Sequence, residues 1–334
     1  MILIRYCFLI LLGACVLNKP GPTFTPFVES DVRYSNGGVE LGAALLMPQG
    51  RGPFPGAVIL QGSGDSDRSN TWSRQWAEAL ASRGIATLLT DKRGTGKSTG
   101  EWRAVGFEEL ARDGIAGVEF LQSQRGVRKS KVGVVGLSQG GQVAPLAGAL
   151  SSNVAFVADI SGSATGPVAQ VDHEMRNTFR EAELDEEGVA AGMRLQELAG
   201  RYIMTGDWDS YHAALQQALA SPLKPVAQGF PQTRDFWLWE WWRKIKDYDP
   251  IDSWKRLDVP GLVVYGELDE RDNVPVAASV ARLAPLELDH DLSVHVIPET
   301  GHALFDHSRS DHALRADVVD LIVKWIHAHE VKGR

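Results

Sequence analysis

A serine, a histidine and several acidic residues follow apolar segments of this chain in an order that suits nucleophilic catalysis. Ser138 lies in the segment Gly136-Leu137-Ser138-Gln139-Gly140, directly after the apolar run at 131–135. This pattern predicts a buried strand, a tight turn that lifts the serine off the sheet edge, and the start of a helix. Because a helix N-terminus favours negative charge, we predict that Ser138 is a nucleophile and not merely part of a small-residue connection.

A serine nucleophile needs a base, and the base needs an acid that orients it. In open parallel sheets such groups gather at the carboxyl ends of strands. Asp269 is the first aspartate after the apolar run at 261–265, with Glu270 and Asp272 as competing acids. His302 follows the last expected strand and is placed to act as the base. The expected catalytic set is therefore Ser138, Asp269 and His302.

The negative charge that develops on a substrate oxygen needs hydrogen-bond donors that are already in place. The backbone amide of Gln139, directly after the serine, is the first expected donor. The second comes from the loop after Leu60, where Ser63 is preferred and Gly62 is the alternative.

Short apolar segments alternate with amphipathic ones along most of the chain. The expected strands are 27–34, 39–47, 56–60, 84–89, 131–135, 154–160, 261–265 and 292–297, and the expected helices outside the strand-free segment include 72–82, 107–122 and 313–329. Asn36-Gly37-Gly38 is a hairpin turn signal between the first two strands. Alternating apolar strands and helices predict an α/β fold with a mostly parallel sheet covered by helices on both faces.

One segment, at about 165–249, contains no convincing strand. Its helical, charged stretches fall between two sheet strands on the catalytic side, so we expect a helical lid. Near its end lie Trp237, Trp239, Trp241 and Trp242, four of the ten tryptophans. We expect these side chains to contribute to a substrate pocket, with packing inside the lid as the alternative for at least two of them.

Length, composition and charge are those of an ordinary globular enzyme. The 334 residues are 44% hydrophobic and 23% charged, with a net charge of −8 and a pI near 5.6. The chain therefore suits one domain with an insertion, here 27–334. Because no basic run exists, nucleic acid is not an expected partner.

The first residues resemble a bacterial leader. Residues 1–14 hold one charge, Arg5, and an apolar run, as short secretory signals do. Leu12-Gly13-Ala14-Cys15 resembles a lipobox, which would make Cys15 a lipidated first residue, followed by a tether at 15–26. We expect a cell-envelope location in which the lipid is the sole membrane contact. An ordinary cleaved leader, or a wrongly assigned start with a cytoplasmic protein, is the alternative.

Two further motifs do not carry cofactor chemistry. Gly94-Thr95-Gly96-Lys97-Ser98 looks like the end of a P-loop, but Asp91 stands where the first glycine is required. His327 and His329 are two apart on an expected helix and so point to different faces. We expect neither a cofactor nor a metal.

The chain resembles the α/β-hydrolase superfamily, in particular bacterial serine-aminopeptidase-like and dienelactone-hydrolase-like esterases and acyl-thioester hydrolases. The resemblance rests on segments 61–68, 91–98, 136–141, 265–269 and 301–302 and on the order Ser138, Asp269, His302. It departs from the group at Gln61-Gly62, where His-Gly is frequent, and in a longer acid loop.

These observations predict a serine hydrolase that acts on a small-molecule carboxylic ester, or on a thioester. A serine aminopeptidase or other peptidase is the alternative enzyme. Carboxylates of the helical segment, such as Glu174, Glu181 and Glu183, could then bind a substrate ammonium. An envelope binding protein built on a hydrolase scaffold is the non-enzymatic alternative.

Overall fold

The computed structural model describes residues 25–182 and 184–329. The expected leader, Cys15, most of the tether and Glu183 lie outside the described residues. Within the described part, no helix combines the length and the apolar character needed to cross a bilayer.

Eight strands form one sheet in the order β1-β2-β4-β3-β5-β6-β7-β8. The strands are β1 (Phe27–Asn36), β2 (Val39–Pro48), β3 (Phe54–Leu60), β4 (Ala86–Thr90), β5 (Val127–Leu137), β6 (Val157–Ile160), β7 (Gly261–Gly266) and β8 (Leu292–Ile297). β1 and β2 form an antiparallel hairpin, and β2 is also antiparallel to β4. From β4 to β8 every neighbouring pair is parallel, so the carboxyl ends of these strands share one edge.

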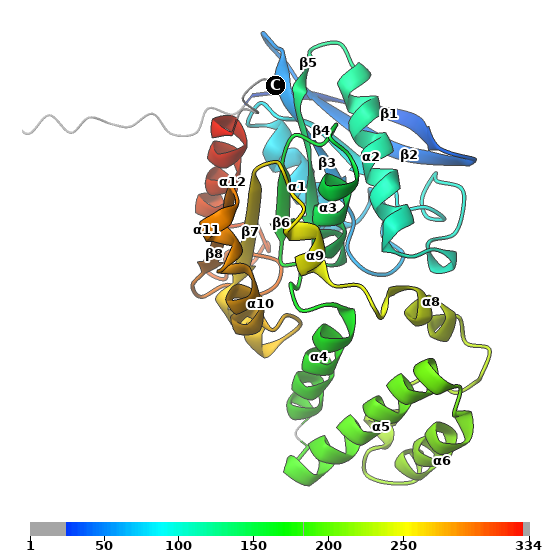
Figure 1. Ribbon diagram of the computed structural model, residues 1–334. Helices are drawn as coiled ribbons and strands as arrows, with labels where there is room; N and C mark the ends of the chain where they lie inside the picture. Colours follow the sequence, from blue (N-terminus) through cyan, green and yellow to red (C-terminus); the bar gives the residue numbers. More distant parts are fainter. Residues whose placement is uncertain (1–24, 183, 330–334) are drawn as a thin grey trace, which may run out of the picture.

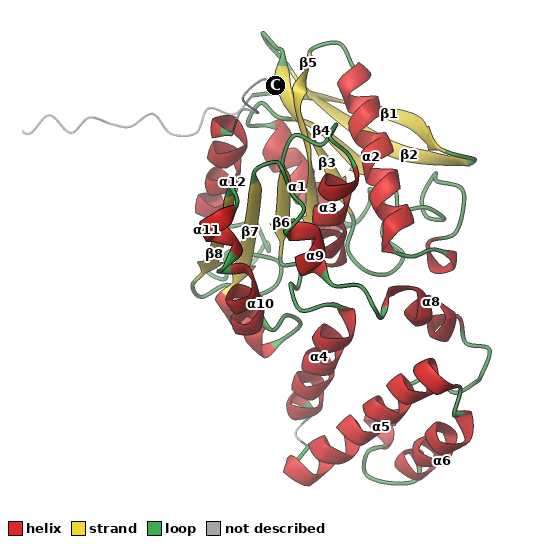
Figure 2. Cartoon of the chain, viewed as in Figure 1, coloured by secondary structure: helices red, strands yellow, loops and turns green. Residues whose placement is uncertain are grey.

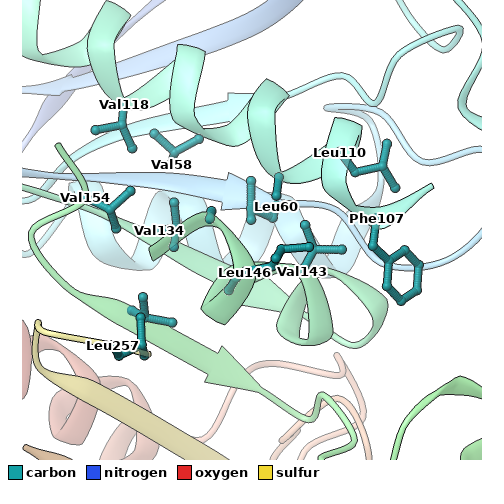
Figure 3. Close-up of a cluster of buried hydrophobic side chains, with 14 of the residues drawn as sticks. Val58, Leu60, Phe107, Leu110, Val118, Val134, Val143, Leu146, Val154 and Leu257 are labelled. Carbon is teal, nitrogen blue, oxygen red and sulfur yellow. The ribbon is translucent and has the colours of Figure 1, made fainter. Parts of the chain in front are cut away.

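Helices cover both faces of the sheet (Figures 1 and 2). The first face packs against α2 (Phe107–Ser123), α3 (Gln139–Leu150) and α9 (Pro250–Trp254), and the second against α1 (Thr71–Ala81) and α12 (Ala316–Ala328). Figure 3 shows Val58 and Val134 of the sheet against Val118 of α2 and Val143 of α3. Because both faces are buried, the residues of β3 and β7 are apolar, as the sequence pattern predicts, and β4 departs from this only at the buried Thr87 and Thr90.

A helical insertion separates β6 from β7. It contains α4 (Pro167–Glu181), α5 (Glu186–Thr205), α6 (Trp208–Leu219), α7 (Lys224–Ala227) and α8 (Trp237–Ile245), followed by α9. Phe179, Tyr211 and Trp239 are among the buried side chains of its own apolar cluster. In Figure 1 this insertion lies beyond the edge of the sheet and is joined to it through α4 and the segment after α8.

Four short elements in loops next to the sheet were not expected from the sequence. They are the 3₁₀ helices η1 (Trp102–Ala104) and η2 (Glu267–Arg271) and the helices α10 (Val276–Leu283) and α11 (Leu286–Asp289). Elements of three to eight residues leave too little periodicity to stand out in a sequence. Two of them, η1 and η2, lie in loops at the carboxyl edge.

The loop after β4 is anchored by two ion pairs. The Asp91 carboxylate accepts hydrogen bonds from Arg68, with Nη2 at 2.7 Å, and from the amide of Lys97 at 2.8 Å. Arg93 forms a two-pronged pair with Asp113 of α2, at 2.7 Å from Nε and 2.6 Å from Nη2. Both side chains of the Arg93–Asp113 pair are largely buried, so each charge depends on the other.

We expect Arg93→Met to lower the free energy of unfolding by about 3–5 kcal/mol, because it leaves the Asp113 carboxylate buried without its partner. Chemical denaturation with the linear extrapolation checks this. Arg112→Met on the same helix is the control, since Arg112 and Glu108 are both exposed, and should change stability by about 0.5 kcal/mol or less. Equal effects of the two substitutions would contradict the assignment, whereas partial recovery in a double Arg93→Met, Asp113→Leu variant would support it.

Candidate active site

Ser138 occupies a strained turn between β5 and α3. Its φ and ψ are 54° and −117°, an unfavourable combination for a residue with a side chain. The turn is held by two hydrogen bonds: the amide of Ser138 donates to the carbonyl of Ile160 at 2.9 Å, and its carbonyl accepts from the amide of Gly141 at 2.8 Å. The structure therefore places the serine at the carboxyl edge of the sheet, between two parallel strands, at the N-terminus of a helix.

Two glycines allow the backbone segments around Ser138 to approach each other. A Cβ atom on Gly136 would lie 2.0 Å from the carbonyl oxygen of Gly140, and one on Gly140 would lie 2.2 Å from the carbonyl oxygen of Leu60. Both distances are far too short for a side chain. The G-x-S-x-G spacing is thus required by the contact of this turn with itself and with the end of β3.

Asp269 and His302 are brought together from two different loops. Asp269 lies in η2, after β7, and its side chain is fully buried. Its Oδ2 lies 2.7 Å from Nδ1 of His302, and its Oδ1 accepts from the amide of Asn273 at 3.2 Å. Because an ionised carboxylate can only accept, Nδ1 carries the proton, and Nε2 of the imidazole is left as an acceptor.

The two competing acids make other contacts. Glu270 accepts a hydrogen bond from the amide of Ala277 at 2.7 Å, at the start of α10. Asp272 is exposed, and its backbone carbonyl accepts from the side chain of Asn177 at 3.1 Å. The carboxylate that is hydrogen-bonded to His302 is therefore that of Asp269.

The loop that carries His302 is held by residues that the sequence did not single out. The Ser161 hydroxyl donates to the carbonyl of His302 at 2.7 Å, and Trp72 Nε1 donates to the carbonyl of Ala303 at 3.0 Å. The Trp72 ring also lies beside the imidazole, with ring centroids 5.5 Å apart. Ser161 directly follows β6, so its position at the carboxyl end of a strand is a signal that sequence analysis could have used.

Ser138 and His302 line the same cavity, which has a volume of about 280 Å³. Gly62 and Ser63 line it as well. The lining is mostly polar and includes Asn70, Ser73, Gln170, Glu174 and Asn273. Trp72 and Leu137 are the apolar side chains among the described residues that line it. This arrangement favours a polar group over a long hydrocarbon chain next to the serine.

The expected oxyanion donors lie beside the serine. Gln139 is the first residue of α3, a position whose amide has no acceptor within its helix. A Cβ atom on Gly62 would lie 3.6 Å from the Cβ of Ser138, so the loop after β3 runs directly next to the serine. Within the described part of the chain, the amides of Gly62 and Ser63 donate no hydrogen bond.

The four tryptophans of α8 lie elsewhere, and none of them is among the described residues that line this cavity. Trp239 is 2% exposed inside the insertion, and Trp241 packs edge-on against Trp102. Trp237 is 38% exposed, and Trp242 lines a separate apolar cavity of about 170 Å³. The expectation that they contribute to a substrate pocket therefore gains no support from the lining of this cavity and stays a prediction. Because α8 is amphipathic, it packs these rings into the insertion and onto η1.

Glu174 is an acidic side chain in this cavity that lacks a cationic partner. It projects from α4, and its carboxylate forms no hydrogen bond or ion pair with any described residue. Burial raises its pKa above the usual range, an effect opposed by His302 and reinforced by Asp272 and Asp269. In contrast, Glu181 at the end of the same helix is exposed. Among the described residues, no group of histidine, cysteine and acidic side chains is arranged to hold a metal ion.

Comparison with known proteins identifies relatives of the sheet and its loops. A family model described as the alpha/beta hydrolase family matches residues 57–316. Esterase EstD of Thermotoga maritima is 29% identical over 124 residues, which are 36% of this chain and 29% of that protein. The uncharacterised protein PA2218 of Pseudomonas aeruginosa is 31% identical over 142 residues, or 42% and 38% of the two chains. The matches thus span about a third of the curated relatives.

Solved structures share the fold at low sequence identity. The structure of PA2218 has a TM-score of 0.58 and 20% identity, and the alignment covers 92% of this chain and 96% of that one. The Pyrococcus furiosus esterase PF2001 has a TM-score of 0.57 and 18% identity, with coverages of 91% and 92%. These likenesses extend over the sheet and the insertion together.

Proposed function

Because the chain belongs to the alpha/beta hydrolase family, we propose that it is a serine hydrolase that cleaves carboxylic esters through an acyl-enzyme on Ser138. One observation carries this proposal: Ser138, on a strained strand–helix turn, and His302 line the same cavity. Nδ1 of that histidine is hydrogen-bonded to the buried carboxylate of Asp269. The partial match to a protein named as an esterase supports the same reaction class. Thioesters, which react by the same acyl transfer, are a further substrate class.

Each group has a defined task in the proposed reaction. The Ser138 hydroxyl oxygen attacks the acyl carbon while Nε2 of His302 accepts its proton. Asp269 holds the imidazole in the required tautomer and stabilises the imidazolium that forms. The amides of Gln139 and Ser63 donate to the oxyanion. His302 then gives its proton to the leaving group. In the second half of the reaction a water molecule attacks the acyl carbon while Nε2 of His302 accepts a proton from it, and this proton returns to the Ser138 oxygen as the acyl group leaves.

A second candidate function, hydrolysis of aminoacyl esters or amides, is favoured by Glu174. A half-buried carboxylate without a partner in a substrate cavity would gain a partner if the substrate carried an ammonium group. The polar lining of the cavity supports the same class of substrate. Glu181 is too exposed to contribute to such a pocket.

We expect a fluorophosphonate probe to label the wild-type protein on Ser138, because the probe reacts with activated serines. Ser138→Ala should abolish labelling and lower turnover of an aryl ester by several orders of magnitude. Peptide mass spectrometry locates the adduct. Ser63→Ala is the control, since the proposed donor at that residue is the backbone amide. Wild-type protein that neither labels nor hydrolyses esters would favour the binding-protein alternative.

We expect Asp269→Asn to reduce kcat by about 10⁴, because an amide at this position favours the wrong imidazole tautomer. The matched variant Asp272→Asn should retain most of the activity, since Asp272 is exposed. Steady-state kinetics on one aryl ester, with circular dichroism as a folding control, compare the two. A crippled Asp272→Asn enzyme beside a nearly normal Asp269→Asn enzyme would show that the acid is misassigned.

We expect Glu174→Gln to discriminate between two matched substrates. For an amino acid aryl ester with a free ammonium, kcat/KM should fall by about 10- to 100-fold, the size of a lost charge-assisted hydrogen bond. For the N-acetylated ester, kcat/KM should change little. Glu181→Gln, on the same helix, is the control and should affect neither substrate. Equal losses on both substrates, or none, would remove the aminoacyl candidate while leaving the esterase proposal intact.

A further inference from the structure

We propose that Lys92 is a positioning residue that orients the second oxyanion donor by binding carbonyl groups of the loop after β3 on the side away from the Ser138 cavity. This inference rests on the proposed function, since it concerns the peptide that would stabilise the oxyanion in that reaction. Lys92 lies in the loop after β4, and it does not line the Ser138 cavity. It would therefore act through the loop and without touching the substrate.

All three hydrogens of the Lys92 ammonium have acceptors around the candidate active site. Nζ donates to the carbonyl of Gly62, to the carbonyl of Gly64 at 3.0 Å, and to Oε1 of Gln139 at 3.3 Å. The first two acceptors belong to the loop after β3, and the third belongs to the residue that follows the nucleophile. One buried amine thus ties together the two segments that carry the expected oxyanion donors.

The direction of the Ser63 amide follows from this contact. In a trans peptide the C=O and N–H bonds point in opposite directions. The carbonyl of Gly62 points to Lys92, so the N–H of Ser63, which belongs to the same peptide unit, points away from Lys92. Ser63 lines the cavity that also contains Ser138 and His302, whereas Lys92 lines a different and smaller cavity together with Gln139. The Ser63 amide is therefore directed to the side of the loop where an oxyanion would form.

The contact also favours Ser63 over Gly62 as the donor and strengthens it. An ammonium bonded to the carbonyl end of a peptide polarises that peptide and makes its N–H a better donor. Because the side chain of Gln139 accepts a hydrogen bond from the same amine, this side chain is directed to Lys92 and away from the serine. The amide of Gln139 then remains beside the serine without competition from its own side chain.

The surroundings of Lys92 hold the amine in one place. Its side chain is 7% exposed, and Nζ lies 5.0 Å from the ring centroid of Trp102 in η1. Trp102 Nε1 donates to Asp65 at 2.7 Å, and Arg103 pairs with the same carboxylate at 2.6 Å. The two residues that flank Lys92 are fixed by ion pairs, Asp91 with Arg68 and Arg93 with Asp113.

Protonation of Lys92 determines how many donors it offers. Burial lowers the pKa of its amine to about 7, with Asp65 raising it and Arg103 lowering it. Below this pKa the ammonium has three hydrogens and a charge, and as pH rises through it one hydrogen and the charge are lost. The contribution of Lys92 to catalysis should therefore be larger on the acidic side of this pKa than on the basic side.

The experiment compares Lys92→Met with wild-type enzyme about one pH unit below and one above this pKa. Loss of a single oxyanion donor costs about 10²–10³ in kcat, and loss of its support should cost about 10- to 100-fold, with KM for an aryl ester little changed. Binding of an aryl trifluoromethyl ketone, which forms a tetrahedral alkoxide on the serine, should weaken by a similar factor. The ratio of wild-type kcat to variant kcat should be larger at the lower pH. We compare the ratio because the pH dependence caused by groups that both proteins contain affects both kcat values equally.

Lys97→Met is the matched control, because Lys97 lies in the same loop but is half-exposed and pairs with Asp31 at 2.5 Å. It should leave kcat unchanged. If Lys92→Met does not fold, Lys92→Gln takes its place; because it keeps a neutral donor, it should lower kcat in the same direction but by a smaller factor. Wild-type kcat in the Lys92 variant, or a loss confined to KM, overturns the inference. Fluorophosphonate labelling of wild-type protein separates this result from failure of the proposed function.

Discussion

The close approach of backbone to backbone around Ser138 is the constraint on which the candidate active site depends. The turn can contact the end of β3 because Gly140 has no side chain, and it can fold back on itself because Gly136 has none. That contact places the exit of β3, and hence Gly62 and Ser63, directly beside the serine. The strained φ of Ser138 persists because hydrogen bonds to Ile160 and Gly141 hold the turn from both sides.

The helical insertion contributes to the site through α4. One side of this helix presents Gln170 and Glu174 to the cavity that holds Ser138. From the same helix His173 bonds to the carbonyl of Glu270 at 2.8 Å and Asn177 donates to the carbonyl of Asp272 at 3.1 Å. The loop that carries Asp269 is thus held by the insertion, while the loop that carries His302 is held by Ser161 after β6 and by Trp72 of α1. The lining of the cavity and the position of Asp269 therefore both depend on a single helix.

The sheet, its strand order along the chain and the segment around Ser138 could be predicted because their signals are local. Apolar runs bounded by glycine indicate buried strands, and G-x-S-x-G after a strand indicates the turn. The pairing of Asp269 with His302 could be proposed as the first choice among three acids, but the choice itself depends on η2, a 3₁₀ helix too short to be expected from sequence. The rest of the cavity lining, such as Gln170 and Asn273, could not be predicted, because it depends on how the insertion and the loops pack. The tryptophans of α8 illustrate this: their spacing indicates an apolar stripe but not which neighbour the stripe covers, and here it covers η1 and the core of the insertion.

Three consecutive residues show how one loop supports another. These residues lie in the loop after β4. Asp91 accepts hydrogen bonds from Arg68, at the far end of the loop after β3, and Lys92 donates to carbonyl groups near the start of that loop. Arg93 ties the loop after β4 to α2 through its ion pair with Asp113. A charged residue in this loop could be expected to form ion pairs, but a buried lysine with carbonyl acceptors has no sequence signature. A side chain without a hydrogen-bond donor at position 92 would fill the same space without fixing the direction of the Gly62–Ser63 peptide. The donor that we propose at this position follows from peptide geometry, since controlling where an N–H points means binding the carbonyl on its opposite side.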